Sequence, residues 1–155
     1  MKKLILFLLF SASCWSQANG FIVRQKKLVW ESVVITSETN IPELVSKHSR
    51  LTIASSDKSL HKGKGAHFKN TCPGASAFMD QEFSFDFEIE EGDGKYRVTI
   101  SNIVYHDKNK QAGAERYFIE KSALKQDEAS SLNLGCLDFY LNRLFTMTSV
   151  YKNKM

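Results

Sequence analysis

Apolar and polar residues alternate regularly in the segment 82–104, which is the clearest structural signal in the sequence. Every second residue of its first half is apolar, namely Phe83, Phe85, Phe87 and Ile89. A period of two buries one face of a β-strand. Asp93-Gly94 then supplies the positive φ angles of a two-residue turn, and a return strand runs from Lys95 to about Tyr105. The pattern predicts a β-hairpin.

Pairing outward from the turn predicts the register of this hairpin. The expected apolar pairs are Ile89–Val98, Phe87–Ile100 and Phe83–Val104, and the expected polar pairs are Glu90–Arg97 and Glu88–Thr99. A slip of one residue would turn the phenylalanines toward water, so the register is well specified. Asn102 falls opposite Phe85 on the apolar face. We therefore expect a bulge or a strand end there.

Shorter patterns predict the other elements of the first two thirds of the chain. Asn40 can cap a helix in which Pro42 occupies the first turn and Glu43 completes a capping box. This helix should end near Arg50. The remaining expectations are a strand at 27–35, a strand at 51–54, a loop at 55–77 with glycines and a proline as breakers, and a short strand at 117–119.

A long amphipathic helix is expected at the C-terminus, from Glu128 or Ala129 to Tyr151. Its apolar stripe comprises Cys136, Leu137, Tyr140, Leu141, Leu144, Phe145, Thr148 and Tyr151. Gly135 weakens the helix locally. Together the elements predict a single α+β domain over 21–151, with an antiparallel sheet, a short early helix and a longer last helix.

The N-terminus has the features of a secretory signal peptide. Lys2-Lys3 is followed by an apolar run at 4–10, too short to span a bilayer, and by small residues at 11–13. We expect residues 1–16 to be removed, with a cut after Ala18 as an alternative. A third alternative is lipidation of Cys14, although Ser11 stands where a lipobox usually has leucine. The protein is thus expected to be periplasmic or secreted, or lipid-anchored in the envelope.

Removal of the signal peptide changes the charge of the chain. The formal net charge falls from +4 to +2, because Lys2 and Lys3 are the only charged residues among the first sixteen. A chain this close to neutral lacks the basic character of a nucleic-acid-binding protein. No later apolar run reaches the roughly 20 residues of a transmembrane helix. We therefore expect neither a nucleic-acid partner nor a membrane span in the mature chain.

Cleavage would leave one pair of cysteines, Cys72 and Cys136. In an oxidising compartment an isolated pair is a disulfide candidate. The alternative is two unpaired buried thiols that behave as small apolar groups.

The order of these elements resembles a known family. A tryptophan-bearing first strand (Leu28-Val29-Trp30-Glu31-Ser32-Val33) and the segment Gly94–Ile103 carry most of the similarity. They resemble a family of small exported bacterial proteins of unknown function whose fold is like that of the TATA-box-binding protein. The resemblance implies a curved antiparallel sheet with helices on one side. It implies neither DNA binding nor any catalytic residue.

A basic segment between 58 and 69 is the first candidate site. Its side chains are Lys58, His61, Lys62, Lys64, His67 and Lys69. The preferred interpretation is a solvated loop that offsets acidic residues of the hairpin. The alternative, which two glycines in the segment would allow, is an anion-binding loop for phosphate, lipid headgroups or acidic glycans. His61, His67 and Cys72 match no zinc-ligand spacing, so we expect no metal and no cofactor.

Hydrolase chemistry requires a nucleophile, a base and an orienting group. His106-Asp107 with a serine supplies these residue types, and His67 with Cys72 supplies a thiol and a base, but neither set stands in a recognised signature.

The leading functional hypothesis is a non-enzymatic envelope or secreted domain that binds a protein or cell-surface partner through its sheet face or edge. The aromatic residues are expected to fill the core, namely Trp30, Phe83, Phe85, Phe87, Tyr140 and Phe145. If they line a pocket instead, the chain is a carrier of a small apolar or anionic ligand. An exported hydrolase is the third hypothesis.

Overall fold

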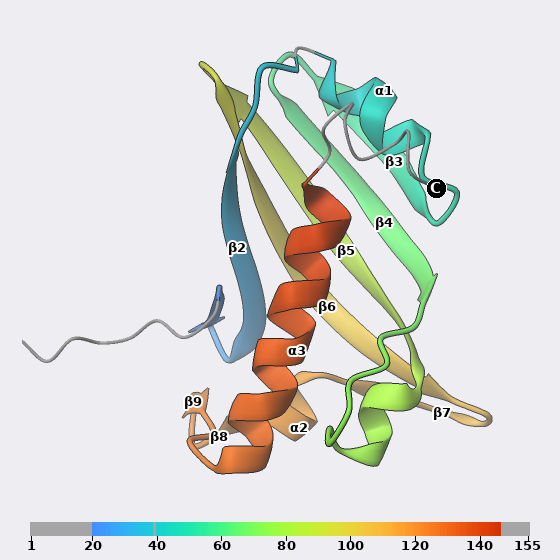
Figure 1. Ribbon diagram of the computed structural model, residues 1–155, viewed down its shortest axis with the longest axis vertical. Coiled ribbons are helices and arrows are strands. Elements are labelled where there is room, and N and C mark those ends of the chain that lie inside the picture. The colour runs from blue at the N-terminus through green and yellow to red at the C-terminus, as the bar shows by residue number, and fades with distance from the viewer. Residues whose placement is uncertain (1–19, 39, 147–155) are drawn as a thin grey trace, which may run out of the picture.

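Seven antiparallel strands form one curved sheet, and a long helix lies across one face of it (Figure 1). This computed structural model describes residues 20–38 and 40–146. The strands of the sheet are β1 (Phe21–Arg24), β2 (Lys27–Ile35), β3 (Leu51–Asp57), β4 (Leu60–Phe68), β5 (Glu82–Gly92), β6 (Lys95–Asp107) and β7 (Lys110–Gly113). Their order is β1-β2-β6-β5-β4-β3, with β7 paired to the far end of β6.

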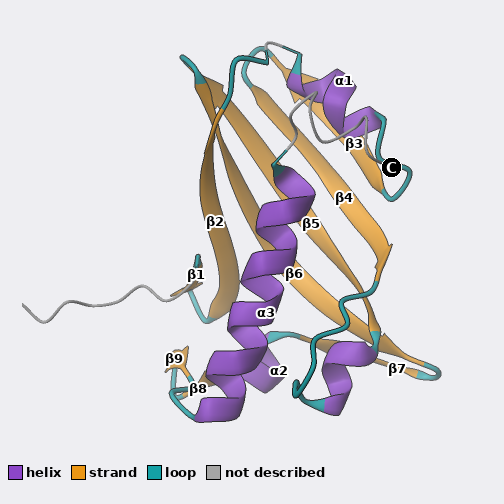
Figure 2. Ribbon diagram, in the orientation of Figure 1, coloured by secondary structure: helices purple, strands orange, loops and turns teal. Residues whose placement is uncertain are grey.

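The helices are short except for the last. They are α1 (Ile41–Ser46), the 3₁₀ helix η1 (Ala77–Asp80), α2 (Glu115–Phe118) and α3 (Glu128–Phe145), and a small hairpin of β8 (Ile119–Glu120) and β9 (Ala123–Leu124) precedes α3. Figure 2 shows α3 crossing the sheet and α1 beside β3. We call the face that α3 covers the inner face. The predicted α+β class and the curved antiparallel sheet are confirmed.

The predicted hairpin is β5 and β6, and its register is confirmed up to the bulge. Ile89 pairs with Val98, Phe87 with Ile100, and the two polar pairs are also as expected. Asn102 has a φ of 50°, and the register shifts between Ser84 and Asp86. The extra residue in β6 makes Phe83 pair with Tyr105, so the predicted Phe83–Val104 pair is wrong by one residue.

The start of α1 follows its capping sequence. Asn40 Oδ1 accepts a hydrogen bond from the backbone N–H of Glu43 at 3.1 Å, and Asn40 Nδ2 donates to the Glu43 carboxylate at 3.1 Å. The helix ends at Ser46 rather than near Arg50, so its predicted length was too great. The following residues lead into β3, which runs to Asp57 and is longer than expected.

The loop predicted at 55–77 is wrong over its first half, because β4 occupies Leu60–Phe68. Gly63 and Gly65 looked like breakers, but both lie inside this strand. A Cβ on Gly63 would overlap the Phe87 ring and the Thr52 carbonyl oxygen, and a Cβ on Gly65 would overlap the Phe85 ring. The glycines therefore let rings of β5 lie over the backbone of β4.

The strand predicted at 117–119 is also wrong over most of its length. Tyr117 and Phe118 belong to α2, and only Ile119 is in a strand, the two-residue β8. The Tyr117 ring stacks on Phe78, with centroids 4.0 Å apart, and Phe118 is fully buried. Aromatic packing of these two side chains thus overrides their strand propensity.

The last helix begins at the predicted residue. The Asp127 carboxylate caps it by accepting from the Ser130 backbone N–H at 2.8 Å and from the Ser130 hydroxyl at 2.7 Å. These hydrogen bonds lower the pKa of Asp127. The described helix ends at Phe145, and the predicted continuation through Thr148 to Tyr151 lies outside the described residues.

Apolar and polar contacts together fix α3 on the inner face. Phe145 packs against Phe85, Phe87 and Trp30, with ring centroids 5.7–6.5 Å apart. Asp138 Oδ1 accepts from the Trp30 indole N–H at 2.7 Å and from the Gly20 backbone N–H at 2.8 Å. The helix is therefore tied to β2 by a polar contact and to β5 by aromatic packing.

We predict opposite stability effects for alanine at two glycines. Gly63→Ala should lower the free energy of unfolding by about 2 kcal/mol, because the new methyl group overpacks the Phe87 ring. Gly135→Ala should raise it by about 1 kcal/mol, since Gly135 lies inside α3 with nothing within 4 Å of an added Cβ. Urea denaturation measures both. Destabilisation of equal size at the two positions would contradict this packing.

Candidate functional site

The predicted anion-binding loop is not a loop, because most of its side chains belong to β4. Lys62 and Lys64 are exposed on the outer face, where Lys62 Nζ lies 2.9 Å from Glu88 and Lys64 pairs across from Asp86. His67 lies 3.1 Å from Glu82. Lys58 is in the turn between β3 and β4, and Lys69 follows the strand. Four of the six side chains thus belong to β4, and Lys62, Lys64 and His67 lie beside acidic residues of β5.

His61 differs from the rest of that set because it points to the inner face. It is 3% exposed. Its Nδ1 lies 2.6 Å from the Ser56 hydroxyl, and its Nε2 lies 2.8 Å from a carboxylate oxygen of Glu91. The three side chains come from the neighbouring strands β3, β4 and β5. Sequence reasoning had grouped His61 with the lysines and missed both of its partners.

Neither set of residues considered for hydrolase chemistry is assembled into a nucleophile, a base and an orienting group. His106 Nε2 lies 2.8 Å from the Ser84 hydroxyl, whereas the Asp107 carboxylate accepts from the backbone N–H of Lys108 at 2.7 Å. His67 and Cys72 do not form a pair, since Cys72 is in a disulfide. Within residues 20–38 and 40–146, no group of three or more His, Cys, Asp or Glu side chains is arranged to hold a metal ion.

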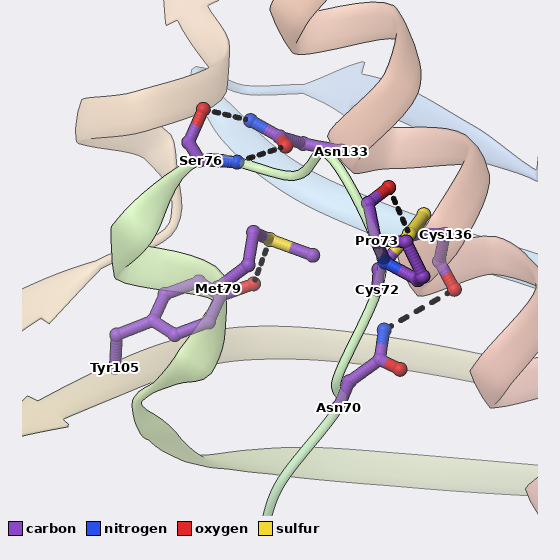
Figure 3. The surroundings of a disulfide bond; sticks show 8 residues. All are labelled: Asn70, Cys72, Pro73, Ser76, Met79, Tyr105, Asn133 and Cys136. Atoms are coloured by element: carbon purple, nitrogen blue, oxygen red, sulfur yellow. Dashed lines mark hydrogen bonds between the residues drawn. A yellow bond between two sulfur atoms is a disulfide. The ribbon is translucent and has the colours of Figure 1, made fainter.

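The structure joins Cys72 and Cys136 in a disulfide (Figure 3). Cys72 lies between β4 and η1, and Cys136 lies on α3, so the bond ties this connection to the helix. Asn70 Nδ2 donates to the Cys136 carbonyl at 3.3 Å. Asn133 accepts from the Ser76 backbone N–H at 3.0 Å. The disulfide therefore lies among polar contacts that hold the same two segments together.

The inner face is filled by aromatic side chains. Of the residues expected in the core, Trp30, Phe83, Phe85, Phe87 and Phe145 are buried and Tyr140 is partly buried. The Tyr105 hydroxyl donates to the Met79 sulfur at 3.3 Å. Burial, and secondarily the nearby Tyr117, raises the pKa of Tyr105 far above its ordinary value.

The two edges of the sheet differ. The β3 edge carries a register shift between Ile53 and Ser55 and ends in the polar run Ser55-Ser56-Asp57. Bulges and polar residues protect an edge from further pairing. The β2 edge is paired to β1 only over Lys27–Trp30, with one more hydrogen bond from Glu31 to Gly20. Among the described residues, nothing pairs with the rest of this edge.

The register shows which main-chain groups of β2 point outward. Gly92 and Lys95 close a two-residue turn and therefore form a hydrogen-bonded pair. Alternation along β6 then directs Ser32 and Val34 of β2 toward β6. Val33 and Ile35 must point the other way, as Glu31 does when its N–H donates to the Gly20 carbonyl at 2.9 Å. We call Ser32–Ile35 the open edge.

The side chains of the open edge are also exposed. Val33 is 54% exposed and Ile35 is 84% exposed. On the same outer face, Val33 pairs across from Arg97 and Ile35 from Lys95. The open edge therefore combines two apolar side chains and two neighbouring cations with backbone groups that have no partner among residues 20–38 and 40–146. The sequence identified the strand, but an apolar run of this kind gave no sign that part of it lies at an edge.

Comparison with solved structures identifies the fold. A TBP-like protein from Parabacteroides distasonis is 15% identical and has a TM-score of 0.55, with 80% of this chain and 91% of that chain covered. A DUF4468 family protein from Bacteroides ovatus is also 15% identical, with a TM-score of 0.53 and coverage of 84% and 89%. No family model and no curated protein matches the sequence.

These likenesses confirm the predicted resemblance to small bacterial proteins with a TBP-like fold, at the level of the fold. At this identity they carry no activity or partner over to the chain. None of the helices in the described part of the chain is long and apolar enough to cross a membrane.

We predict that the mature, non-reduced protein has no free thiol at Cys72 or Cys136 after denaturation. Reduction should lower the free energy of unfolding by about 4 kcal/mol, because the bond closes a long loop in the unfolded chain. A thiol assay and urea denaturation with and without reductant measure these effects. In the matched control C72S/C136S, reductant should change nothing. Two free thiols in the untreated protein would contradict the disulfide.

Proposed function

We propose that this chain is an exported binding domain that accepts an extended segment of a partner protein as an added strand on the open edge, Ser32–Ile35. Residues 1–16 serve as the signal peptide in this account, and residues 21–151 form the domain. The mature protein acts in the periplasm or the secreted fraction, or on the envelope if Cys14 is lipidated. Binding, rather than catalysis, is the role of the open edge.

The outward main-chain groups of Val33 and Ile35 are the observation that carries this proposal. An added antiparallel strand would pair with the N–H and C=O of both residues, which gives four hydrogen bonds. A strand edge that is protected against pairing with another chain usually carries a charge, a proline or a bulge. The open edge carries none of these, whereas the β3 edge has a register shift and polar residues.

The side chains beside the open edge favour a partner of particular chemistry. On the outer face, an added strand would place its residues beside Val33 and Ile35, one strand away from Arg97 and Lys95. Apolar residues at alternate positions would bury the exposed valine and isoleucine. Acidic residues on the same face, just beyond the apolar ones, would complement the two cations. We therefore expect an extended partner segment that is apolar on one face and acidic at its flanks.

Site-specific photo-crosslinking tests this function. A photoreactive amino acid at Val33 of the exported protein, in intact cells, should crosslink to one partner protein. The same amino acid at Thr52, an exposed residue of the opposite edge strand, is the matched control and should not capture that partner. Adding Ile35→Lys to the Val33 probe should reduce the crosslink at least about tenfold, because a charge at an edge opposes strand addition.

Two outcomes would overturn the proposal. Equal crosslinking from Val33 and Thr52 would show that the open edge has no special role. Recovery of lipid alone would favour the carrier hypothesis.

N-terminal sequencing of the same purified material shows whether the mature chain starts at Gln17, Asn19 or a modified Cys14.

A further inference from the structure

A second and chemically distinct site lies across the sheet from the open edge, where Ser56, His61 and Glu91 form one hydrogen-bonded line. We propose that Ser56 is a nucleophile activated by His61 and Glu91, with small activated carboxylic esters as its substrates. This site shares no residue with the open edge, so it does not depend on the binding function proposed above.

The register of the hairpin β3–β4 places the serine on the imidazole. Asp57 and Leu60 close a two-residue turn and form a hydrogen-bonded pair, which makes Ser56–His61 the next, non-hydrogen-bonded pair. Side chains of such a pair lie closer together, in keeping with the 2.6 Å between the Ser56 hydroxyl and His61 Nδ1. The Glu91 backbone N–H donates to the Ser59 carbonyl at 2.7 Å, so β5 also holds the turn.

The hydrogen-bond partners of His61 define the tautomer that a general base requires. An ionised Glu91 carboxylate can only accept, so Nε2 of His61 must carry a hydrogen. In the neutral ring Nδ1 then has a lone pair, and the Ser56 hydroxyl donates to it. In this neutral tautomer the serine proton points at the base, while Glu91 orients the ring and stabilises the cation that forms.

The same register assigns a hydrogen-bond donor for the developing oxyanion. Main-chain groups of a non-hydrogen-bonded pair point away from each other, so the Ser56 N–H points out of the β3 edge. A backbone N–H of the nucleophile itself is one of the donors in a serine-protease oxyanion hole. In an interior strand this N–H would donate to a neighbouring strand. Because β3 is an edge strand, the Ser56 N–H can instead donate to the oxyanion.

Exposure of the three groups suits this chemistry. Ser56 is exposed, so an ester can reach its hydroxyl, whereas His61 is 3% exposed and is shielded from water. In the first step Ser56 Oγ bonds to the acyl carbon of the ester, and the hydroxyl proton of Ser56 moves to His61 Nδ1. The bond between the acyl carbon and the alkoxide oxygen then breaks. The alkoxide takes the proton from His61 and leaves as the alcohol. A water molecule then gives a proton to His61 Nδ1 as its oxygen bonds to the acyl carbon. The bond from that carbon to Ser56 Oγ breaks, Oγ takes the proton back from His61, and the carboxylic acid leaves.

The chain contains an internal control for this site. Ser84 also hydrogen-bonds a histidine, His106, at 2.8 Å. Its strand β5 lies between β4 and β6, and no carboxylate in the described residues hydrogen-bonds His106. Ser84 therefore has a base within reach but lacks both the orienting carboxylate and the open strand edge that Ser56 has. A serine–histidine contact alone would make the two serines equally reactive.

Labelling with a fluorophosphonate probe tests the proposal. Ser56 Oγ should form the bond to phosphorus as the P–F bond breaks, with fluoride leaving and the serine proton passing to His61. Mass spectrometry of the digested, full-length mature protein should find the label on Ser56 and not on Ser84. Ser56→Ala should abolish labelling, and Ser84→Ala should leave it unchanged. His61→Gln should slow labelling by about 100-fold or more.

A second variant separates activation of the serine from a purely structural role of the cluster. Glu91→Gln keeps an oxygen that accepts from His61, so the thermal midpoint should stay close to that of the unaltered chain. The labelling rate should fall at least about tenfold, because a neutral amide stabilises the imidazolium less than a carboxylate does. With p-nitrophenyl acetate, kcat should fall and KM should not change.

Three results would overturn the proposal. These are an unlabelled Ser56 in the folded protein, equal labelling of Ser56 and Ser84, and an unchanged labelling rate in folded Glu91→Gln. If His61→Gln does not fold, as judged by near-ultraviolet circular dichroism, the Glu91→Gln rate decides the question.

Discussion

The contact between α3 and the inner face of the sheet is the constraint on which the rest of the structure depends. Phe145 packs onto rings of β5, and Asp138 accepts from the buried Trp30 indole of β2. The disulfide fixes the same helix to the segment before η1. With this face occupied by aromatic side chains, the backbone groups of the sheet that a partner could pair with lie at its two strand edges.

The fold could be predicted from the sequence where local signals agreed with burial. The alternation of β5 and the Asp93-Gly94 turn specify the central hairpin, and even the irregularity at Asn102 was visible as a polar residue on an apolar face. The wrong predictions of secondary structure arose where tertiary packing overrode local propensity. Gly63 and Gly65 are breakers by propensity, yet the rings of Phe87 and Phe85 cover them within β4.

The candidate sites could not be predicted in the same way, because each depends on which strands become neighbours. His61 and Glu91 are 30 residues apart and meet only because β4 pairs with β5. The open edge exists only because β1 stops pairing at the residue after Trp30. Val33 looks like an ordinary buried strand residue until that boundary is known. The two edges differ accordingly: one is apolar and its outward backbone groups have no partner in the described part of the chain, and the other is polar and lies beside His61 of β4.

Residue-resolved hydrogen exchange of the mature protein shows whether the β2 edge of the sheet is open. Ser32 and Val34 point their N–H groups at β6, whereas Val33 and Ile35 point theirs outward, so four consecutive amides contain their own control. We expect the amides of Val33 and Ile35 to exchange at least about 100-fold faster than those of Ser32 and Val34. Equal protection of all four amides would show that the edge is already covered.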